Sequence, residues 1–278
     1  MYKRQHYFRD QVALSGVNSI NWARVVAQVV YYFTSAAAIG APSRSVDFTV
    51  PTGNFGDIFA GFVAKCMGLP IRNLRIAANI NDILPRTLKT GIYEVREVHA
   101  TASPSMDIQV SSNFERLLFE ASGRDAETVR RLMESLKQSG RFVLPDAMLA
   151  RIREDFDAGR ADETETAAAI RAAFREAGDL VDPHTAVALA VADRDTSDTS
   201  VPNIVLSTAH PAKFPDAVEA ACGIRPHLPV WLEGLMNKRE DTRIMRNDQS
   251  EVEKFILSVS RAATVSYTHL RAHETKAN

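Results

Sequence analysis

The spacing of apolar and polar positions predicts a strand, a tight connection and a helix early in the chain. Residues 46–50 are apolar at every second position, which is typical of a buried strand, and Pro51 ends this run. Residues 58–67 are apolar at helical spacing, and a glycine and a proline just beyond them end the pattern. The connection, residues 53–57, has the sequence Gly-Asn-Phe-Gly-Asp.

Short strands and amphipathic helices alternate along the rest of the chain. Three further apolar runs are predicted strands: residues 74–78, 93–98 and 203–207. Helical spacing recurs in residues 18–32, in a long block over 111–178, in segments that start at Pro183 and Pro215, and in residues 248–263. Charged stretches such as residues 151–157 are interpreted as solvent-facing sides of helices. The alternation predicts an α/β fold, with a mostly parallel sheet flanked by helices and an extra helical block.

Polar residues mark the expected helix starts. Asn18, Ser19 and Asn21 precede the first long helix, and Asp182 is an expected N-cap before a first-turn proline. A Ser or Asp three residues before a Glu has the spacing of a capping box. This spacing occurs in three pairs: Ser112 with Glu115, Asp162 with Glu165, and Asp248 with Glu251.

Composition narrows the class of protein. The chain has 278 residues, of which 45% are hydrophobic, and a formal net charge of −1, so it matches an ordinary globular protein rather than a nucleic-acid or membrane-surface protein. No apolar run reaches transmembrane length, and no signal peptide or metal site is predicted. Cys66 and Cys222 lack ligand spacing and are predicted to be buried thiols, which fits a cytoplasmic location.

The connection at residues 53–57 is the first candidate for chemistry. Glycines between a buried strand and a helix start let bare backbone N–H groups converge, and the helix dipole favours an anion there. The pattern predicts a phosphate site. Two other interpretations stay open: an ordinary turn, and a loop that clamps a nucleic-acid backbone. The sequence matches neither the G-x-x-x-x-G-K-[ST] nor the G-x-G-x-x-G nucleotide motif.

Two more clusters could bind ligands. Ser19 and Arg24, with neighbouring amides, could form a second anion site, although a helix cap plus a surface arginine explains them equally simply. The polar loop at residues 208–214 directly follows a predicted strand, and the carboxyl ends of strands are where open α/β sheets bind ligands. His184 is either a ligand or, more simply, a residue of a helix start.

At this point the motifs resemble those of threonine synthase, a pyridoxal-phosphate (PLP) enzyme of fold type II. Six motifs occur in the family's order over residues 8–263: N-S-I-N-x-x-R from Asn18, P-T-G-N-F-G-D from Pro51, N-I-N-D from Asn79, S-M-D-I-Q-V-S from Ser105, D-P-H-T-A-V-A from Asp182 and T-A-H-P-A-K-F from Thr208. The resemblance implies the second half of a fold type II enzyme, similar to the tryptophan synthase β subunit.

The resemblance also implies a set of site residues. The loop that holds the PLP phosphate through its backbone would consist of Gly53, Asn54, Phe55, Gly56 and Asp57, and Thr208 would offer its hydroxyl to the pyridine nitrogen. Ser19, Arg24 and Asn54 would contact the substrate's own phosphate. The implied reaction converts O-phospho-L-homoserine and water to L-threonine and phosphate, the last step of threonine biosynthesis, with PLP stabilising carbanions.

The chain also departs from the family. Members carry their Schiff-base lysine in an F-K-D motif in the first half, and neither that motif nor the Ser/Thr/Gly-rich carboxylate-binding motif is present. Lys65 lies inside a predicted helix and Lys213 lies in the loop at residues 208–214, so neither has the sequence context of the family's Schiff-base lysine. We therefore expect no catalytic residue here, and an inactive C-terminal fragment whose partner is the missing N-terminal half, with apolar sheet edges left exposed. Residues 6–263 are the expected native part, and residues 1–5 and 264–278 the expected non-native ends.

Two alternatives remain. The first is another fold type II lyase, such as a threonine or serine dehydratase, which has no substrate phosphate and therefore no need of Ser19 with Arg24. The second is a non-catalytic phosphate- or nucleic-acid-binding module, which would need a basic rim around residues 53–56. Only Arg44 and Lys65 are basic near that loop in the sequence.

Overall fold

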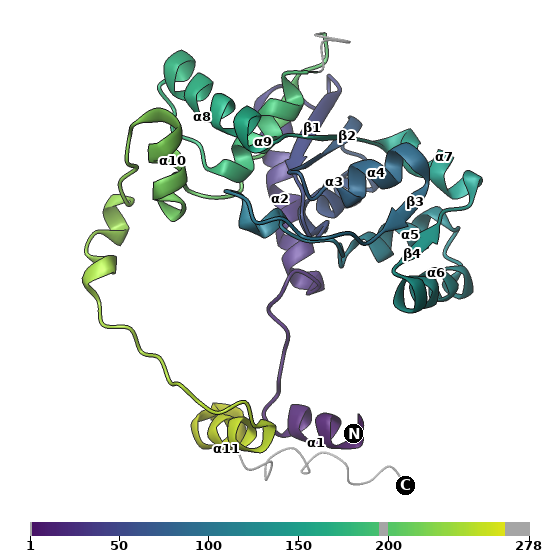
Figure 1. The fold of residues 1–278 in the computed structure, drawn as a ribbon. Coiled ribbons are helices and arrows are strands. Elements are labelled where there is room, and N and C mark those ends of the chain that lie inside the picture. The colour runs from purple at the N-terminus through teal and green to yellow at the C-terminus, as the bar shows by residue number, and fades with distance from the viewer. Residues whose placement is uncertain (1, 195–199, 265–278) are drawn as a thin grey trace, which may run out of the picture. The chain divides into compact units, whose positions relative to one another are not determined.

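The computed structural model describes residues 2–194 and 200–264. These residues belong to two compact units, one of residues 18–230 and one of residues 1–17 with residues 231–278. The larger unit contains a four-stranded sheet in the order β5 (Phe156–Arg160), β2 (Ile71–Ala78), β1 (Val46–Pro51) and β6 (Asn203–Val205) (Figure 1). All three pairings are parallel, with Val50 opposite Ile76 and Thr49 opposite Val205. The α/β prediction is confirmed.

Helices cover both faces of this sheet. On one face, α3 (Gly56–Cys66) packs on β1 and β2, and α2 (Trp22–Ala38) packs on α3. On the other face, α9 (Pro183–Ala192) packs on the strands, backed by α8 (Glu163–Ala177) and α10 (Pro215–Cys222). Since both faces are covered, every residue of β1 is buried, as expected for a parallel strand. Its alternate residues Val46, Phe48 and Val50 belong to the main core.

The predicted helical block also contains two strands. Its helices are α5 (Phe114–Ala121), α6 (Ala126–Ser139) and α7 (Asp146–Asp155). The strand β4 (Arg141–Val143) lies between α6 and α7, and β5 follows α7. β4 pairs antiparallel with β3 (Ile92–Glu94), which follows α4 (Ile83–Thr90), and Tyr93 of β3 stacks on Phe142 with ring centroids 4.7 Å apart.

The interpretation of residues 151–157 as helix surface was wrong at its end. Phe156 is buried at the sheet, and the Asp157 carboxylate accepts hydrogen bonds from Arg75 on the neighbouring strand, with Nη2 and Oδ2 2.8 Å apart. A charged side chain that pairs across strands produces the same sequence pattern as one on a helix surface.

The predicted helix caps have mixed outcomes. Asn21 caps α2, Asp182 caps α9, and Asp162 forms a complete capping box with Glu165 at α8. The Asp248 carboxylate accepts from the Glu251 N–H at α11 (Gln249–Val259). The Ser112–Glu115 prediction was wrong. α5 begins after Asn113, and the Ser112 hydroxyl instead donates to the Asn54 side chain.

The smaller unit contains α1 (Tyr2–Gln11), α11, α12 (Arg261–Thr264) and the one-turn helix η4 (Leu235–Asn237), and the one-turn helix η3 (Val230–Leu232) spans the boundary between the two units along the chain. Residues 2–5, for which the sequence showed no periodicity, lie in α1. Residues 265–278 and Met1 lie outside the described residues, so the proposed non-native ends stay a prediction.

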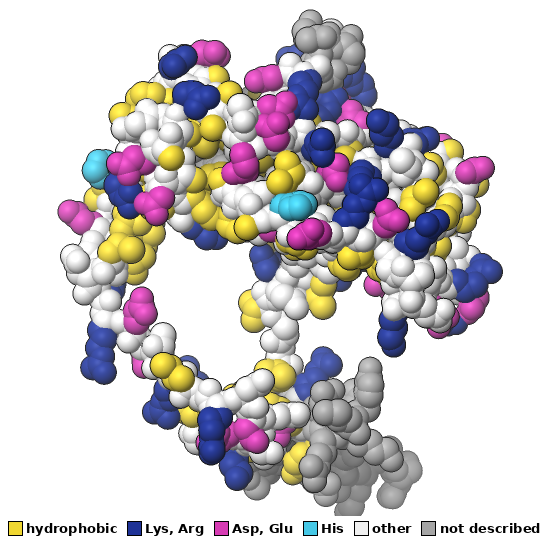
Figure 2. Space-filling view, in the orientation of Figure 1, with side chains coloured by type: hydrophobic (Ala, Val, Ile, Leu, Met, Phe, Trp, Pro, Cys, Tyr) yellow, Lys and Arg dark blue, Asp and Glu magenta, His cyan; other side chains and the backbone are white. Residues whose placement is uncertain are grey.

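Three sequence expectations concern exposure. Cys66 is exposed at the end of α3, so its prediction as a buried thiol was wrong, and Cys222 is half-buried. On the edge strand β6, Ile204 and Val205 are half-buried, and the exposed apolar side chains of the described residues include Trp22, Val26 and Val30 of α2. Basic and acidic side chains are intermingled over the face in Figure 2.

None of the described helices is long and apolar enough to span a membrane. The cytoplasmic location stays a prediction.

Candidate functional site

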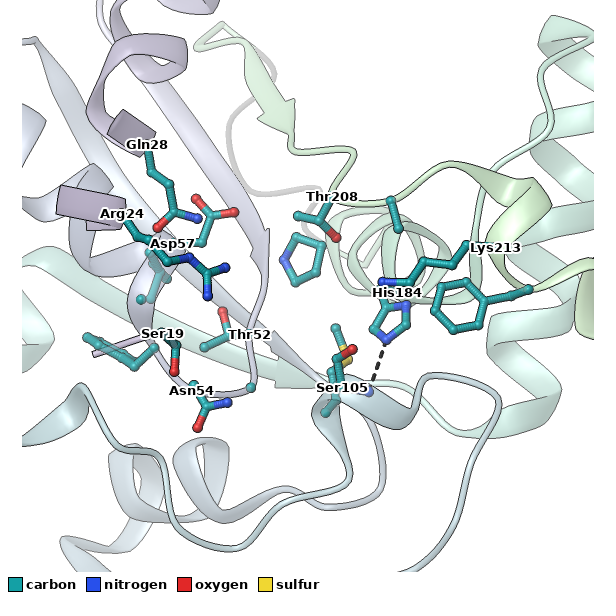
Figure 3. Close-up of a pocket in the computed structure, with 18 residues that line it drawn as sticks. Ser19, Arg24, Gln28, Thr52, Asn54, Asp57, Ser105, His184, Thr208 and Lys213 are labelled. Atoms are coloured by element: carbon teal, nitrogen blue, oxygen red, sulfur yellow. Dashed lines mark hydrogen bonds between the residues drawn. The ribbon is translucent and has the colours of Figure 1, made fainter. Parts of the chain in front are cut away.

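A cavity of about 220 Å³ lies where β1 and β6 end. Its wall contains every residue that the sequence singled out for the site: Ser19, Arg24, Gly53, Asn54, Phe55, Gly56, Asp57 and Thr208. Figure 3 shows Ser19, Arg24 and Asn54 on one side and Thr208, His184 and Lys213 on the other. Segments almost 190 residues apart therefore meet at the carboxyl edge of the sheet, as open α/β sheets require of a binding site.

The loop between β1 and α3 offers hydrogen-bond donors. Within the described residues, no backbone N–H group of residues 53–58 donates to a protein acceptor. Unpaired N–H groups at a helix start, together with the helix dipole, form a ready-made anion site. Phe55 gives the loop its turn, with a left-handed φ of 63°, and its ring is buried against Phe114 and Phe156.

Gly53 has no room for a side chain. A Cβ added there would lie 2.4 Å from the carbonyl oxygen of Ser105, so the loop over Pro104–Met106 packs directly on the Gly53 backbone. Ser105 itself lines the cavity. The glycine is required because a neighbouring backbone approaches it, which keeps the loop close to its present path.

Asp57 is a half-buried acid in the first turn of α3. Burial raises the pKa of its carboxyl to about 6, and hydrogen bonds from the Tyr31 and Tyr32 hydroxyls offset only part of that effect. Burial and the Asp57 charge in turn raise the pKa of both tyrosines. The two hydroxyls hold the carboxylate, so the donors left for an anion in this turn are backbone N–H groups.

The opposite wall is anchored by Asp182, which has no exposed surface. Burial alone would raise the pKa of its carboxyl, but hydrogen bonds from His184 and Thr185 outweigh it, so the pKa lies below its usual value. The Thr185 hydroxyl donates to Asp182 and accepts from the N–H of Thr208 at 3.4 Å. Asp182 thereby fixes the start of the loop that carries Thr208.

His184 joins the two walls. Its Nδ1 lies 2.8 Å from the Asp182 carboxylate, and its Nε2 accepts from the N–H of Ser105 at 3.2 Å, as the dashed line in Figure 3 shows. Nδ1 therefore carries the proton. The sequence left two interpretations of His184, a ligand or a residue of a helix start. The structure places His184 in the first turn of α9, where it also lines the cavity.

Sequence reasoning did not assign four of the lining residues to the site: Gln28, Thr52, Ser105 and Met106. Ser105 was within a recognised motif, and its placement depends on another. The Asn79 and Asn81 amides donate to Asp107, and Asn79 also bonds Ser103, so the N-I-N-D motif organises the loop that reaches the cavity. No local pattern in the sequence shows that these segments meet.

Comparisons with known proteins agree on one family. The family model described as "Threonine synthase, C-terminal" matches residues 185–256. The threonine synthase of Pseudomonas aeruginosa is 46% identical over 255 residues, which cover 90% of this chain and 54% of that protein. The yeast (Saccharomyces cerevisiae) threonine synthase is 45% identical over 233 residues, which cover 77% of this chain and 45% of that protein.

Solved structures give the same result. The PLP-bound threonine synthase of Brucella melitensis superposes with a TM-score of 0.88 at 57% identity, covering 93% of this chain and 56% of that one. The Escherichia coli threonine synthase gives 0.69 at 29% identity, covering 92% and 54%. The fold is thus that of the fold type II class of PLP enzymes. The chain spans about half the length of the relatives it matches. It belongs to the threonine synthase family, as the C-terminal part.

Proposed function

We propose that the cavity holds PLP, with its phosphate on the backbone amides of residues 53–57 and its pyridine nitrogen at the Thr208 hydroxyl. The single observation that carries this proposal is the shared cavity, which the unpaired amides and Thr208 line from opposite sides. Gly53 supports the fit, because a Cβ there would collide with Ser105 and displace the amides. A hydroxyl at the pyridine nitrogen, unlike a carboxylate, does not force that nitrogen to be protonated.

We propose that the whole enzyme converts O-phospho-L-homoserine and water to L-threonine and phosphate. PLP, when bound, supplies stabilisation of carbanions on the substrate. Ser19, Arg24 and Asn54 bind the substrate phosphate, and the position of all three on one side of the cavity supports this role (Figure 3). A dehydratase has no substrate phosphate for this second group of donors, so the phosphorylated substrate is the better match.

The chain by itself provides no Schiff-base lysine in this proposal. Among the described residues, Lys213 is the lysine that lines the cavity, and its Nζ lies 5.6 Å from the centre of the Phe214 ring. Lys65 lies at the far end of α3, paired with Asp155 at 2.6 Å. The N-terminal half of a threonine synthase is therefore the proposed partner, and it would supply the lysine.

Calorimetric titration of the full chain with PLP tests the cofactor site. We expect binding of one PLP per chain. Thr208→Val should weaken it about threefold to tenfold, the effect of one hydrogen bond, and Thr164→Val, at an exposed position of α8 outside the cavity, should leave it unchanged. Equal affinity for wild type and Thr208→Val would overturn the assignment of the pyridine end.

The substrate site is tested by titrating the PLP-loaded chain with O-phospho-L-homoserine. Arg24→Ala should weaken binding about tenfold or more, because it removes a charge-assisted contact. Arg151→Ala, at an exposed position of α7, is the matched control. Borohydride reduction followed by mass spectrometry should find no PLP attached to Lys213, and a stoichiometric adduct there would refute the missing-lysine argument.

A further inference from the structure

One asparagine side chain connects the two candidate phosphate-binding segments. Asn113, only 1% exposed, donates from Nδ2 to the Ser19 carbonyl at 3.1 Å and to the Asn54 carbonyl at 2.9 Å. Its own backbone N–H also donates to the Asn54 carbonyl, at 3.0 Å. Neither the Ser19 segment nor residues 53–55 has regular secondary structure, so side-chain bonds of this kind are what fix their paths.

Neighbours of Asn113 repeat the pattern. The Ser111 hydroxyl donates to the Gly53 carbonyl at 2.7 Å, and Arg116 Nη2 donates to the Ile20 carbonyl at 2.7 Å. Each contact engages a carbonyl oxygen and leaves the N–H groups of the loop for a ligand. The Ser111 N–H is itself held by the Tyr93 hydroxyl at 2.8 Å, in a buried site. Residues at the start of α5 therefore hold both segments, residues 19–20 and residues 53–54, by donating hydrogen bonds to their backbone carbonyl oxygens.

The three segments also lie close to one another. A Cβ added to Gly56 would lie 3.4 Å from Asn113 Nδ2 and 3.5 Å from the Ser19 carbonyl oxygen. A displacement of the Ser19 segment would therefore reach the 53–56 loop through Asn113, and a displacement of the loop would reach Ser19 by the same path.

We propose that Asn113 is a positioning residue that sets the spacing between the cofactor-phosphate loop and the substrate-phosphate segment, and so couples the binding of the two anions. This inference rests on the proposed function for the identity of the anions. An anion that shifts one segment into its binding position shifts the other through the shared amide, so the second anion meets a site that is already in position.

The positioning role of Asn113 is tested first without a ligand, by backbone ¹⁵N relaxation of the full chain. In the wild type, residues 19–20 and 53–56 should have the order parameters of rigid backbone, about 0.85, and in Asn113→Ala both segments should fall below about 0.6. Asn113→Asp, which keeps the shape and loses the donor, serves if the alanine variant does not fold. Asn73→Ala removes a comparable amide that bonds Asp157 at 2.8 Å in the sheet, and both segments should stay rigid in it.

The coupling is tested by titrating PLP with and without saturating O-phospho-L-homoserine. The substrate should tighten PLP binding about fivefold or more in the wild type, and the ratio should approach one in Asn113→Ala. Rigid segments in Asn113→Ala, or a ratio that survives the substitution, would overturn the proposal. If the wild type binds no PLP, the proposed function fails, while the relaxation measurement still decides whether Asn113 holds the two segments.

Discussion

At the scale of single residues, the site depends on a backbone conformation that most side chains avoid. A left-handed φ costs a non-glycine residue about 1 kcal/mol or more, yet Phe55 adopts one at the turn into α3. Its ring is 1% exposed between Phe114 and Phe156, and full burial of a phenylalanine contributes about 2 kcal/mol. The anchored ring therefore offsets the strain and holds the amides of the loop in place.

Gly53→Ala should disrupt the site more than the fold. Its Cβ would lie 2.4 Å from the Ser105 carbonyl oxygen, so one of the two loops must shift, and we expect PLP affinity to fall about tenfold or more. The control is Gly178→Ala, where φ is +69° and nothing lies within 4 Å. That change should cost about 1 kcal/mol of unfolding free energy and leave PLP affinity unchanged. Equal PLP affinities in the two variants would contradict the role of Gly53.

Asp57 should make stability depend on pH in an unusual direction. Because folding raises the pKa of its carboxyl to about 6, the folded chain binds the proton more tightly than the unfolded chain. This contribution to stability is present at low pH and is lost as pH rises from about 4 to about 6. Asp57→Asn removes it, so the stability of the variant relative to the wild type should rise over that interval, by about 3 kcal/mol at most. Urea unfolding at several pH values measures this; parallel pH profiles for the two proteins would refute it.

At the scale of elements, two capping-box spacings had different outcomes. Asp162 and Glu165 make both reciprocal bonds, at 2.9 and 2.8 Å, whereas the Ser112 hydroxyl reaches across to Asn54. The spacing was the same, so local sequence could not separate them. What differs is a partner 58 residues away. Tertiary contacts overrode the local preference at the start of α5.

Asp162→Ala should therefore lower the unfolding free energy by about 1 kcal/mol through the loss of the α8 cap. Ser112→Ala should cost well under that, because α5 has no side-chain cap to lose. Urea denaturation of the two variants measures both values. An equal or larger cost at Ser112 would show that the predicted capping box operates after all.

Much of the fold was predictable because its signals are local. Alternation in residues 46–50, helical spacing in 58–67 and Asp182 before a proline identified β1, α3 and the start of α9. β5 was missed because its five residues, Phe-Asp-Ala-Gly-Arg, directly follow α7 and show little apolar alternation. The site residues were predicted through motifs, while Asn113 and His184 acquire their importance from partners distant in sequence.

At the scale of the whole molecule, the chain spans about half the length of its relatives. We expect the chain alone to release no phosphate from O-phospho-L-homoserine in the presence of PLP, because it lacks the family's lysine motif. Addition of the N-terminal half of the Brucella melitensis enzyme should restore release, which a phosphate assay measures. Release by the chain alone would show that it carries its own base.

The central claim is that one cofactor is gripped at both ends, by the amides of residues 53–57 and by Thr208. A crystal structure of the chain with PLP tests it most directly. The account predicts phosphate oxygens within hydrogen-bonding distance, about 3 Å, of several of those N–H groups, and the pyridine nitrogen at a similar distance from the Thr208 hydroxyl. PLP bound elsewhere, or bound by its phosphate with the ring directed away from Thr208, would contradict it.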